Sequence, residues 1–202
     1  MRTLILICLL ALLSACSPPS VPDVTYFRLP PPKPLAHAEK PLTSLPIVVG
    51  VFSGDGVYAE QALIYATTPD ARSLRTYHYQ LWSDPPTRGL QSRLTQMLRA
   101  SGIAPFVTER LPASDPALRV HATIARYDRI RRATGYVVDV AFEIRVEQGI
   151  GEPVIERTYR AEAQASDDTI ASTVVAFGTA VDGAFAKFYR DLAALGGDSG
   201  AG

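Results

Sequence analysis

Few residues of the chain have the type and spacing that catalysis or metal binding requires. The three histidines, His37, His78 and His121, show no H-E-x-x-H or other paired spacing, whereas zinc needs three or four ligands. No G-x-S-x-G turn presents a nucleophilic serine. His78 and Asp84 could form a catalytic dyad, but Asp84 is better explained as the cap of a following helix. The sequence therefore predicts no catalytic residue, no metal and no cofactor.

Charge and glycine spacing argue against two further ligand classes. The 20 basic and 20 acidic residues balance to a net charge near zero, and binding to nucleic acid needs clustered Lys and Arg. Gly50, Gly54 and Gly56 follow an apolar run, as glycines do in phosphate-binding loops. Their spacing matches neither G-x-G-x-x-G nor G-x-x-x-x-G-K-[ST], so we interpret them as a turn.

Two groups of residues could instead bind a partner. The densest aromatic cluster, residues 77–82, contains the only tryptophan. On a strand, Tyr77 and Tyr79 point to one face and Trp82 to the other, so one face could pack the core while the other meets a partner. An exposed Trp82 would be a natural anchor for that partner, although core packing on both faces is the commoner arrangement.

The second group is basic and lies at one end of a predicted hairpin: Arg126, Arg129, Arg131 and Arg132. These arginines form either a tip that touches anionic lipid, glycan or an acidic partner, or a solvated turn. The candidate partner-binding residues are therefore Tyr77, Tyr79, Trp82, Arg129, Arg131 and Arg132.

Hydrophobic periodicity predicts the elements that position these side chains. Alternation of apolar and polar residues over 136–146 predicts a half-buried antiparallel strand, with Asp139 on its polar face. An apolar stripe from Ile170 to Leu192 steps by three or four and predicts a long helix that covers a sheet. Further strands are predicted at 47–52, 62–66, 74–82, 118–125 and 154–164.

A second helix is predicted over residues 85–101. Asp84 would be its N-cap, Pro85 its first residue and Gly102 its C-terminal cap. Asp167 or Asp168 would cap the long terminal helix. We therefore expect one α+β domain over residues 45–195, in which an antiparallel β-sheet is covered by two main helices.

The N-terminus has the features of an export signal. An apolar run over residues 4–13 follows Arg2, and it is too short to span a bilayer of about 30 Å as a helix. It ends in Leu13-Ser14-Ala15-Cys16, which resembles a bacterial lipobox. The alternative is an ordinary signal peptide in which Cys16 is incidental.

The lipobox resemblance implies that residues 1–15 are removed and that Cys16 is lipidated, which anchors the protein in a membrane. Ser17 stands where lipoproteins retained in the inner membrane often carry Asp, which implies the outer membrane. Residues 16–44 are rich in proline and predict an extended tether, interrupted by a strand-like island at 24–29. Residues 196–202 are expected to form a disordered tail.

Aromatic and proline residues recur with a characteristic spacing: Ile64-Tyr65, then Tyr79-x-x-Trp82-x-x-Pro85-Pro86, then Leu90, Leu94 and Leu98. Together with the lipobox, the Tyr26-Phe27 pair and the final strand–strand–strand–helix half, this spacing resembles the ABC-type transport auxiliary lipoproteins, of which paraquat-inducible protein C is the familiar example. The resemblance spans nearly the whole mature chain. The chain departs from the family pattern at residues 57–61, which lack the expected Arg-Pro.

The resemblance implies a non-enzymatic lipoprotein of an intermembrane lipid-transport system, anchored at the periplasmic face of the outer membrane. Its partner would be a periplasmic MCE-domain protein. Because MCE proteins form rings or tubes, it also implies a homo-oligomer, in the form of a ring, and the near-neutral charge permits such association. Two other hypotheses remain: a structural envelope lipoprotein of another outer-membrane assembly, and an envelope hydrolase that uses His78 or Asp84.

Overall fold

The computed structural model describes residues 22–149 and 152–198. The predicted signal peptide, the lipidation site Cys16 and residues 199–202 of the predicted tail lie outside these ranges.

Three long strands form the centre of the sheet. β7 (Leu118–Arg132), β8 (Gly135–Gln148) and β9 (Ile155–Gln164) pair antiparallel in sequence order. Gly135, with φ of 117°, permits the tight turn between β7 and β8. The predicted alternation along β8 is confirmed, because its inward-facing apolar side chains are at most 1% exposed: Val138, Val140, Phe142, Ile144 and Val146.

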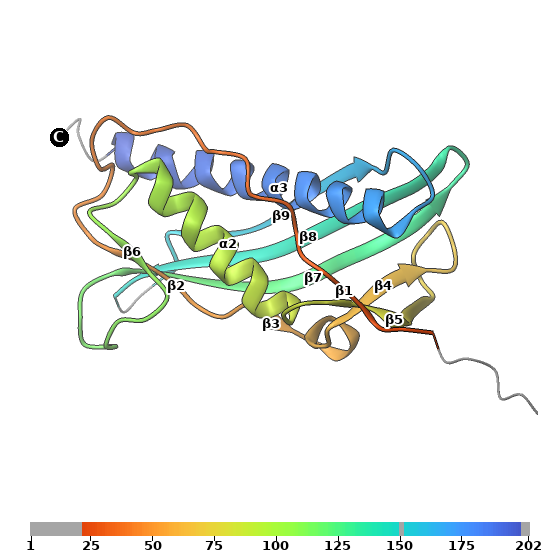
Figure 1. Cartoon of the computed structure of the whole chain (residues 1–202). Helices are drawn as coiled ribbons and strands as arrows, with labels where there is room; N and C mark the ends of the chain where they lie inside the picture. Colours follow the sequence, from red (N-terminus) through yellow and green to blue (C-terminus); the bar gives the residue numbers. More distant parts are fainter. Residues whose placement is uncertain (1–21, 150–151, 199–202) are drawn as a thin grey trace, which may run out of the picture.

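Two α-helices within the described ranges cover one face of this sheet (Figure 1). The long helix α3 (Ile170–Asp198) lies along β8 and β9, and α2 (Pro86–Ser101) crosses beside it. The predicted stripe of α3 faces the sheet, with fully buried Phe177, Phe185 and Phe188. The predicted single α+β domain is therefore confirmed. Neither helix combines the length and apolar character that a bilayer-crossing segment needs.

The sheet is mixed, which corrects the prediction of an antiparallel one. β4 (Ala62–Ala66) pairs antiparallel with β5 (Leu74–Trp82), but β4 also pairs parallel with β7. Further parallel pairs involve the short strands β1 (Thr25–Phe27), β2 (Ile47–Val49), β3 (Ser53–Gly54) and β6 (Val107–Thr108). After β4 the chain forms β5 and α2 before it enters β7. Because a connection that contains a helix can return the chain to the sheet in the same direction, β4 and β7 can pair parallel. A 3-10 helix, η1 (Gly56–Ala59), precedes β4.

The helix ends differ from the predicted caps. α2 begins at Pro86 with Pro85 as its cap, and the Asp84 carboxylate accepts a hydrogen bond from Ser83 instead. Gly102 ends α2 in the left-handed conformation, with φ of 69°, as predicted. At α3, the Thr169 hydroxyl oxygen accepts from the Ser172 amide at 3.1 Å, so Thr169 replaces the predicted aspartates as cap.

The proline-rich segment packs on the domain over residues 25–46, which we call the N-terminal strap. β1 pairs with the end of β5, and the strap then passes beside α2 and runs along α3 (Figure 1). Side-chain hydrogen bonds fix it at three points: from Arg93 to the Pro30 carbonyl at 2.7 Å, from the Lys33 amide to Asp182 at 2.9 Å, and from Tyr189 to the Ala36 carbonyl at 2.7 Å. The folded part therefore begins at β1 and not near Leu45.

Candidate interaction site

Trp82 lies in the core, which corrects the expectation of an exposed anchor. Its side chain is 4% exposed, and its ring lies 5.5 Å from the Tyr127 ring and 5.2 Å from the Phe177 ring. As the last residue of β5, it faces the helices that cover the sheet. The alternative that keeps Trp82 in the core of the monomer is the correct one.

Tyr77 and Tyr79 lie where β5 leaves the register of β4. Ala62 pairs with Leu81 and Ile64 with Thr76, so a two-residue step in β4 faces a five-residue step in β5. The three extra residues belong to the segment 77–80, which we call the β5 bulge. Such irregularities re-aim side chains out of the regular pleat.

The β5 bulge borders an open hollow of about 610 Å³. Tyr77 is half-buried and packs on the Tyr65 ring at 4.5 Å, Tyr79 is half-buried, and His78 is exposed. Val57, from the segment that departs from the family pattern, also lines the hollow. The hollow therefore presents aromatic area and an imidazole to the outside.

Arg129 is buried, unlike the exposed tip residue that the sequence suggested. It is 4% exposed, and its guanidinium lies 3.3 Å from the centre of the Tyr136 ring. Its nitrogens donate to three groups: to the Tyr77 hydroxyl on β5, to Thr173 on α3 at 2.9 Å, and to the Asp168 carbonyl just before α3 at 2.7 Å. Arg129 therefore joins the β7–β8 hairpin to β5 and to the start of α3.

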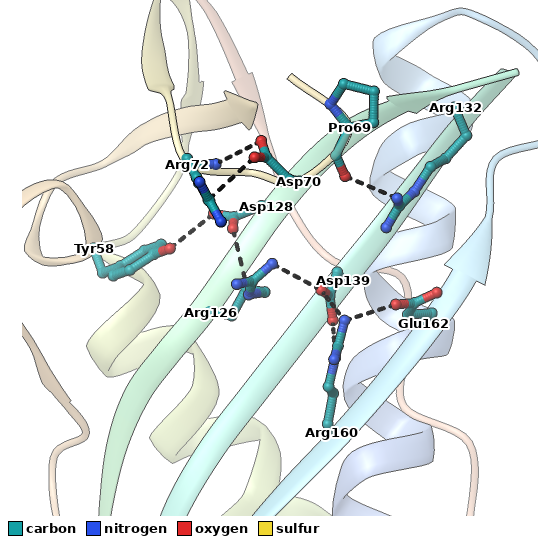
Figure 2. A network of polar contacts seen from close by, with 10 residues as sticks. All are labelled: Tyr58, Pro69, Asp70, Arg72, Arg126, Asp128, Arg132, Asp139, Arg160 and Glu162. Atoms are coloured by element: carbon teal, nitrogen blue, oxygen red, sulfur yellow. Dashed lines mark hydrogen bonds and ion pairs between the residues drawn. The ribbon is translucent and has the colours of Figure 1, made fainter. Parts of the chain in front are cut away.

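Arg131 and Arg132 are the members of the basic group that reach the surface. The Arg131 guanidinium, with a side chain 57% exposed, pairs with Asp168 at 2.9 Å. Arg132 donates to the Pro69 carbonyl in the β4–β5 turn at 2.8 Å (Figure 2). Both side chains therefore stand at the end of the molecule that also carries β1 and the β5 bulge.

A buried acidic pair on the other face of the sheet was missed in the sequence. Asp128 and Asp139 face each other across β7 and β8 and are 1% and 0% exposed (Figure 2). Arg160 holds Asp139 in a bidentate contact at 2.8 and 2.6 Å, and Arg126 reaches Asp139 at 3.2 Å and Asp128 at 4.0 Å. The Tyr58 hydroxyl donates to Asp128 at 3.0 Å.

The pKa of Asp128 is raised to about 6, and burial is the largest cause. The charge of Asp139 also raises this pKa, while the hydrogen bond from Tyr58 and the charge of Arg126 lower it. The sequence could have predicted this acidic pair, because the two aspartates are equally far from the turn of a predicted hairpin and must lie opposite each other. Like charges in that position need compensating cations.

The structure gives no contact between the two residues of the imagined dyad. His78 lies beside the Tyr79 ring at 6.4 Å, and Asp84 has Ser83 as its hydrogen-bond partner. Across residues 22–149 and 152–198, no three His, Cys, Asp or Glu side chains gather as metal ligands.

The fold defines the class of the protein as a single α+β domain in which two helices cover one face of a mixed sheet. A family model described as the ABC-type transport auxiliary lipoprotein component matches residues 27–187, and the chain belongs to this family. The family describes a lipoprotein associated with transport in the cell envelope. No curated protein matches the chain.

Two solved structures share the fold. One is protein XCC0632 from Xanthomonas campestris, of the family DUF330, which is 16% identical with a TM-score of 0.73 and covers 88% of this chain and 100% of its own. The other, described only as an uncharacterized protein, is 16% identical with a TM-score of 0.66 and covers 84% of this chain and 99% of its own. At these identities, the likeness concerns the fold alone.

Proposed function

We propose that the protein is a non-catalytic lipoprotein, anchored at the periplasmic face of the outer membrane through Cys16, that docks a periplasmic MCE-domain protein of an ABC-type lipid-transport system. The observation that carries the proposal is the family match over residues 27–187. The lipobox that ends at Cys16 supports the anchor.

The position of β1 supports the orientation of the domain on the membrane. Thr25 lies nine residues after Cys16, and nine extended residues span at most about 30 Å. The end that carries β1 therefore stays within that reach of the acyl chains. Arg131 and Arg132 stand at this end, where exposed guanidinium groups suit anionic lipid headgroups or an acidic partner surface.

Affinity purification of the intact lipoprotein from envelopes tests the proposal. We expect an MCE-domain protein to co-purify and the lipoprotein to fractionate with the outer membrane, whereas Cys16→Ala should leave the membrane fraction. Co-purification of a β-barrel assembly component instead would favour a structural role in another assembly. Loss of function in His78→Ala or Asp84→Ala, with unchanged folding, would favour a hydrolase.

Surface variants locate the contact. Tyr79→Ala in the β5 bulge and the double change Arg131→Glu with Arg132→Glu should weaken co-purification at unchanged melting temperature. Arg119→Glu is the matched control, because Arg119 is also a surface arginine that donates to loop carbonyls, at Pro112 and Asp115. A mass in solution equal to several chains, measured by sedimentation, would support the proposed homo-oligomeric ring, and a monomer at all concentrations would refute it.

A further inference from the structure

The outer edge of β9 is an unpaired strand edge. β9 pairs with β8 over all ten of its residues without a register shift, and among the described residues it pairs with no other strand. Just beyond β9, the Ala165 amide donates to the Tyr136 carbonyl at 2.9 Å. Because backbone groups alternate in direction along an antiparallel strand, the odd-numbered residues of β9 bond to β8, and the even-numbered ones point their N–H and C=O groups outward.

This edge lacks the usual obstacles to the addition of a further strand. Proline or a bulge often protects an exposed strand edge, and β9 has neither. Within residues 22–149 and 152–198, a single protein donor reaches the outward backbone groups, since Lys187 Nζ donates to the Arg160 carbonyl at 2.6 Å. The even-numbered side chains are all exposed: Glu156, Thr158, Arg160, Glu162 and Gln164. The edge is therefore accessible to another extended chain.

Positive charge gathers beside this edge. A hollow of about 470 Å³ lies between β9 and α3, and Arg157, Lys187 and Arg190 line it together with Asp191. Asp191 accepts from Arg157 at 2.7 Å, whereas Arg190 has no hydrogen bond or ion pair with any described residue. These three cations share one carboxylate in a chain whose net charge is near zero. The local excess of positive charge favours an acidic partner.

The two faces of an added strand would meet different surroundings. The cations of the hollow lie on the side of the sheet that the helices cover. On the other face, Arg160 is already paired with Asp139 at 2.6 Å and with Glu162 at 2.8 Å (Figure 2). Since successive side chains of a strand point to opposite faces, carboxylates at alternate positions would face the hollow. Uncharged residues between them would face the neutralised side.

An extended peptide fits this edge better than a phosphate or a membrane does. A phosphate group accepts hydrogen bonds but donates none to the outward carbonyls, whereas a peptide backbone does both. Arg157 and Arg160 pair with Ile144 and Ala141 of β8, which lie roughly 20–30 Å along the hairpin from its turn at Gly135. The basic hollow is thus displaced from the end of the molecule that carries β1.

We propose that β9 is a docking edge for an extended, acidic segment of a partner protein. The segment adds to the sheet as a further strand and directs alternate carboxylates at Arg157, Lys187 and Arg190. This surface is additional to the one considered above, because β9 and the β5 bulge lie on opposite sides of β7 in the sheet. A defined peptide and the isolated chain suffice to test it, so its outcome does not depend on binding of an MCE-domain protein.

The test uses the chain from residue 16 onward with Cys16→Ser, which retains every described residue. The probe is a peptide as long as β9 that alternates threonine and glutamate. Nuclear magnetic resonance should show saturable amide shifts and slower hydrogen exchange at the even-numbered residues 156–164. The odd-numbered amides should change little, because they already bond to β8.

Charge reversal tests the hollow. Lys187→Glu with Arg190→Glu should weaken peptide binding about tenfold or more, because two attractions become repulsions. Arg190→Gln, which removes one charge, should cause a smaller loss. The matched control is Arg88→Glu with Arg110→Glu, which changes the net charge equally at two exposed arginines on α2 and after β6, away from β9. The control should bind the peptide like the unsubstituted chain.

A second arm tests the backbone pairing. The same peptide with every amide N-methylated keeps its carboxylates but has no N–H, and it should bind about tenfold more weakly or worse. Equal binding of the methylated peptide, or equal losses in the reversed and control variants, would overturn the proposal. So would shifts of these amides that phosphatidylglycerol vesicles cause and the peptide does not. Shifts that appear with protein concentration alone would assign the edge to a second copy of the chain and also overturn it.

Discussion

At the scale of single residues, four arginines of one hairpin have three different environments. Arg129 is buried among β5, α3 and the Tyr136 ring, Arg126 lies between two buried carboxylates, and Arg131 and Arg132 reach the surface. Their type and spacing could not separate them in the sequence, because the partners of Arg129 come from residues 39 to 52 positions away. The sequence predicted the cluster, but only tertiary packing assigns its members.

Arg129→Met should destabilise the fold by about 2–4 kcal/mol, because it removes several hydrogen bonds from a buried charged group and leaves their partners unsatisfied. Urea unfolding measures the change. Arg132→Met is the control, because its bond to the Pro69 carbonyl is exposed and its loss should shift stability by less than about 0.5 kcal/mol. Equal effects of the two substitutions would contradict the buried position of Arg129.

Asp128→Asn should change how stability depends on pH. The folded pKa of Asp128, about 6, lies above the unfolded value of about 3.9, so the folded state binds the proton more tightly. The resulting stabilisation is complete below pH 4 and is lost as the pH rises through 6. The asparagine oxygen still accepts from Tyr58 and carries no charge.

The stability of Asp128→Asn relative to the unsubstituted protein should therefore rise by about 2–3 kcal/mol between pH 4 and pH 7.5. Urea unfolding at these two values measures the difference, in which the contributions of groups distant from Asp128 cancel to first order. An identical pH dependence of the two proteins would show that the Asp128 carboxyl titrates alike in the folded and unfolded chain.

At the scale of elements, the periodic segments and the hairpin of β7 with β8 were predictable, and the pairing of the short strands was not. β8 and α3 carry long patterns of one period, and both bury the predicted faces. The direction of the short strands β2, β3 and β4 depends on the crossover through α2, which no local pattern encodes. The predicted N-caps were wrong, whereas the C-terminal cap Gly102 was right. At α3 the reason is that Asp167 and Asp168 stand next to Thr169, and any of the three has cap chemistry.

One signal in α3 did point to a contact beyond the helix. Gly178 lies in the middle of a helix that is otherwise well formed, and an isolated glycine there is unfavourable without a packing reason. The reason is the strap, because a Cβ on Gly178 would lie 2.6 Å from Cγ of Pro30. The proline ring can approach α3 this closely only where the helix has no side chain.

Gly178→Ala should destabilise the protein by about 1–3 kcal/mol through this overlap, although alanine is favoured over glycine in a helix by about 1 kcal/mol. Gly183→Ala, in the same helix, places its Cβ at 3.4 Å from that of Ala161, an ordinary contact, and should be neutral or stabilising. Melting temperatures of the two variants give the comparison. If both alanines stabilise alike, Pro30 does not pack on α3 in solution.

At the scale of the whole molecule, the N-terminal strap is the largest difference between sequence and structure. Its proline content predicted an extended tether, and the segment is indeed extended, but extended chain is equally able to pack along a surface. What fixes the strap is a set of single long-range contacts, such as that of Lys33 with Asp182, which lie 149 positions apart. The proline content of such a segment predicts its extended conformation but not the residues that it contacts.

The strap is consequently part of the folding unit, and a chain that begins at Leu45 should be less stable than one that begins at Asp23 by at least about 3 kcal/mol. The shorter chain loses the partners of Arg93 and Asp182, which form an ion pair with side chains only 6% exposed, and charged hydrogen bonds contribute about 1.5–3 kcal/mol each. It also exposes Trp82 to water, so its fluorescence should shift to longer wavelength. Urea unfolding followed through Trp82 measures both effects, and equal midpoints with equal emission maxima would show that the domain folds without the strap.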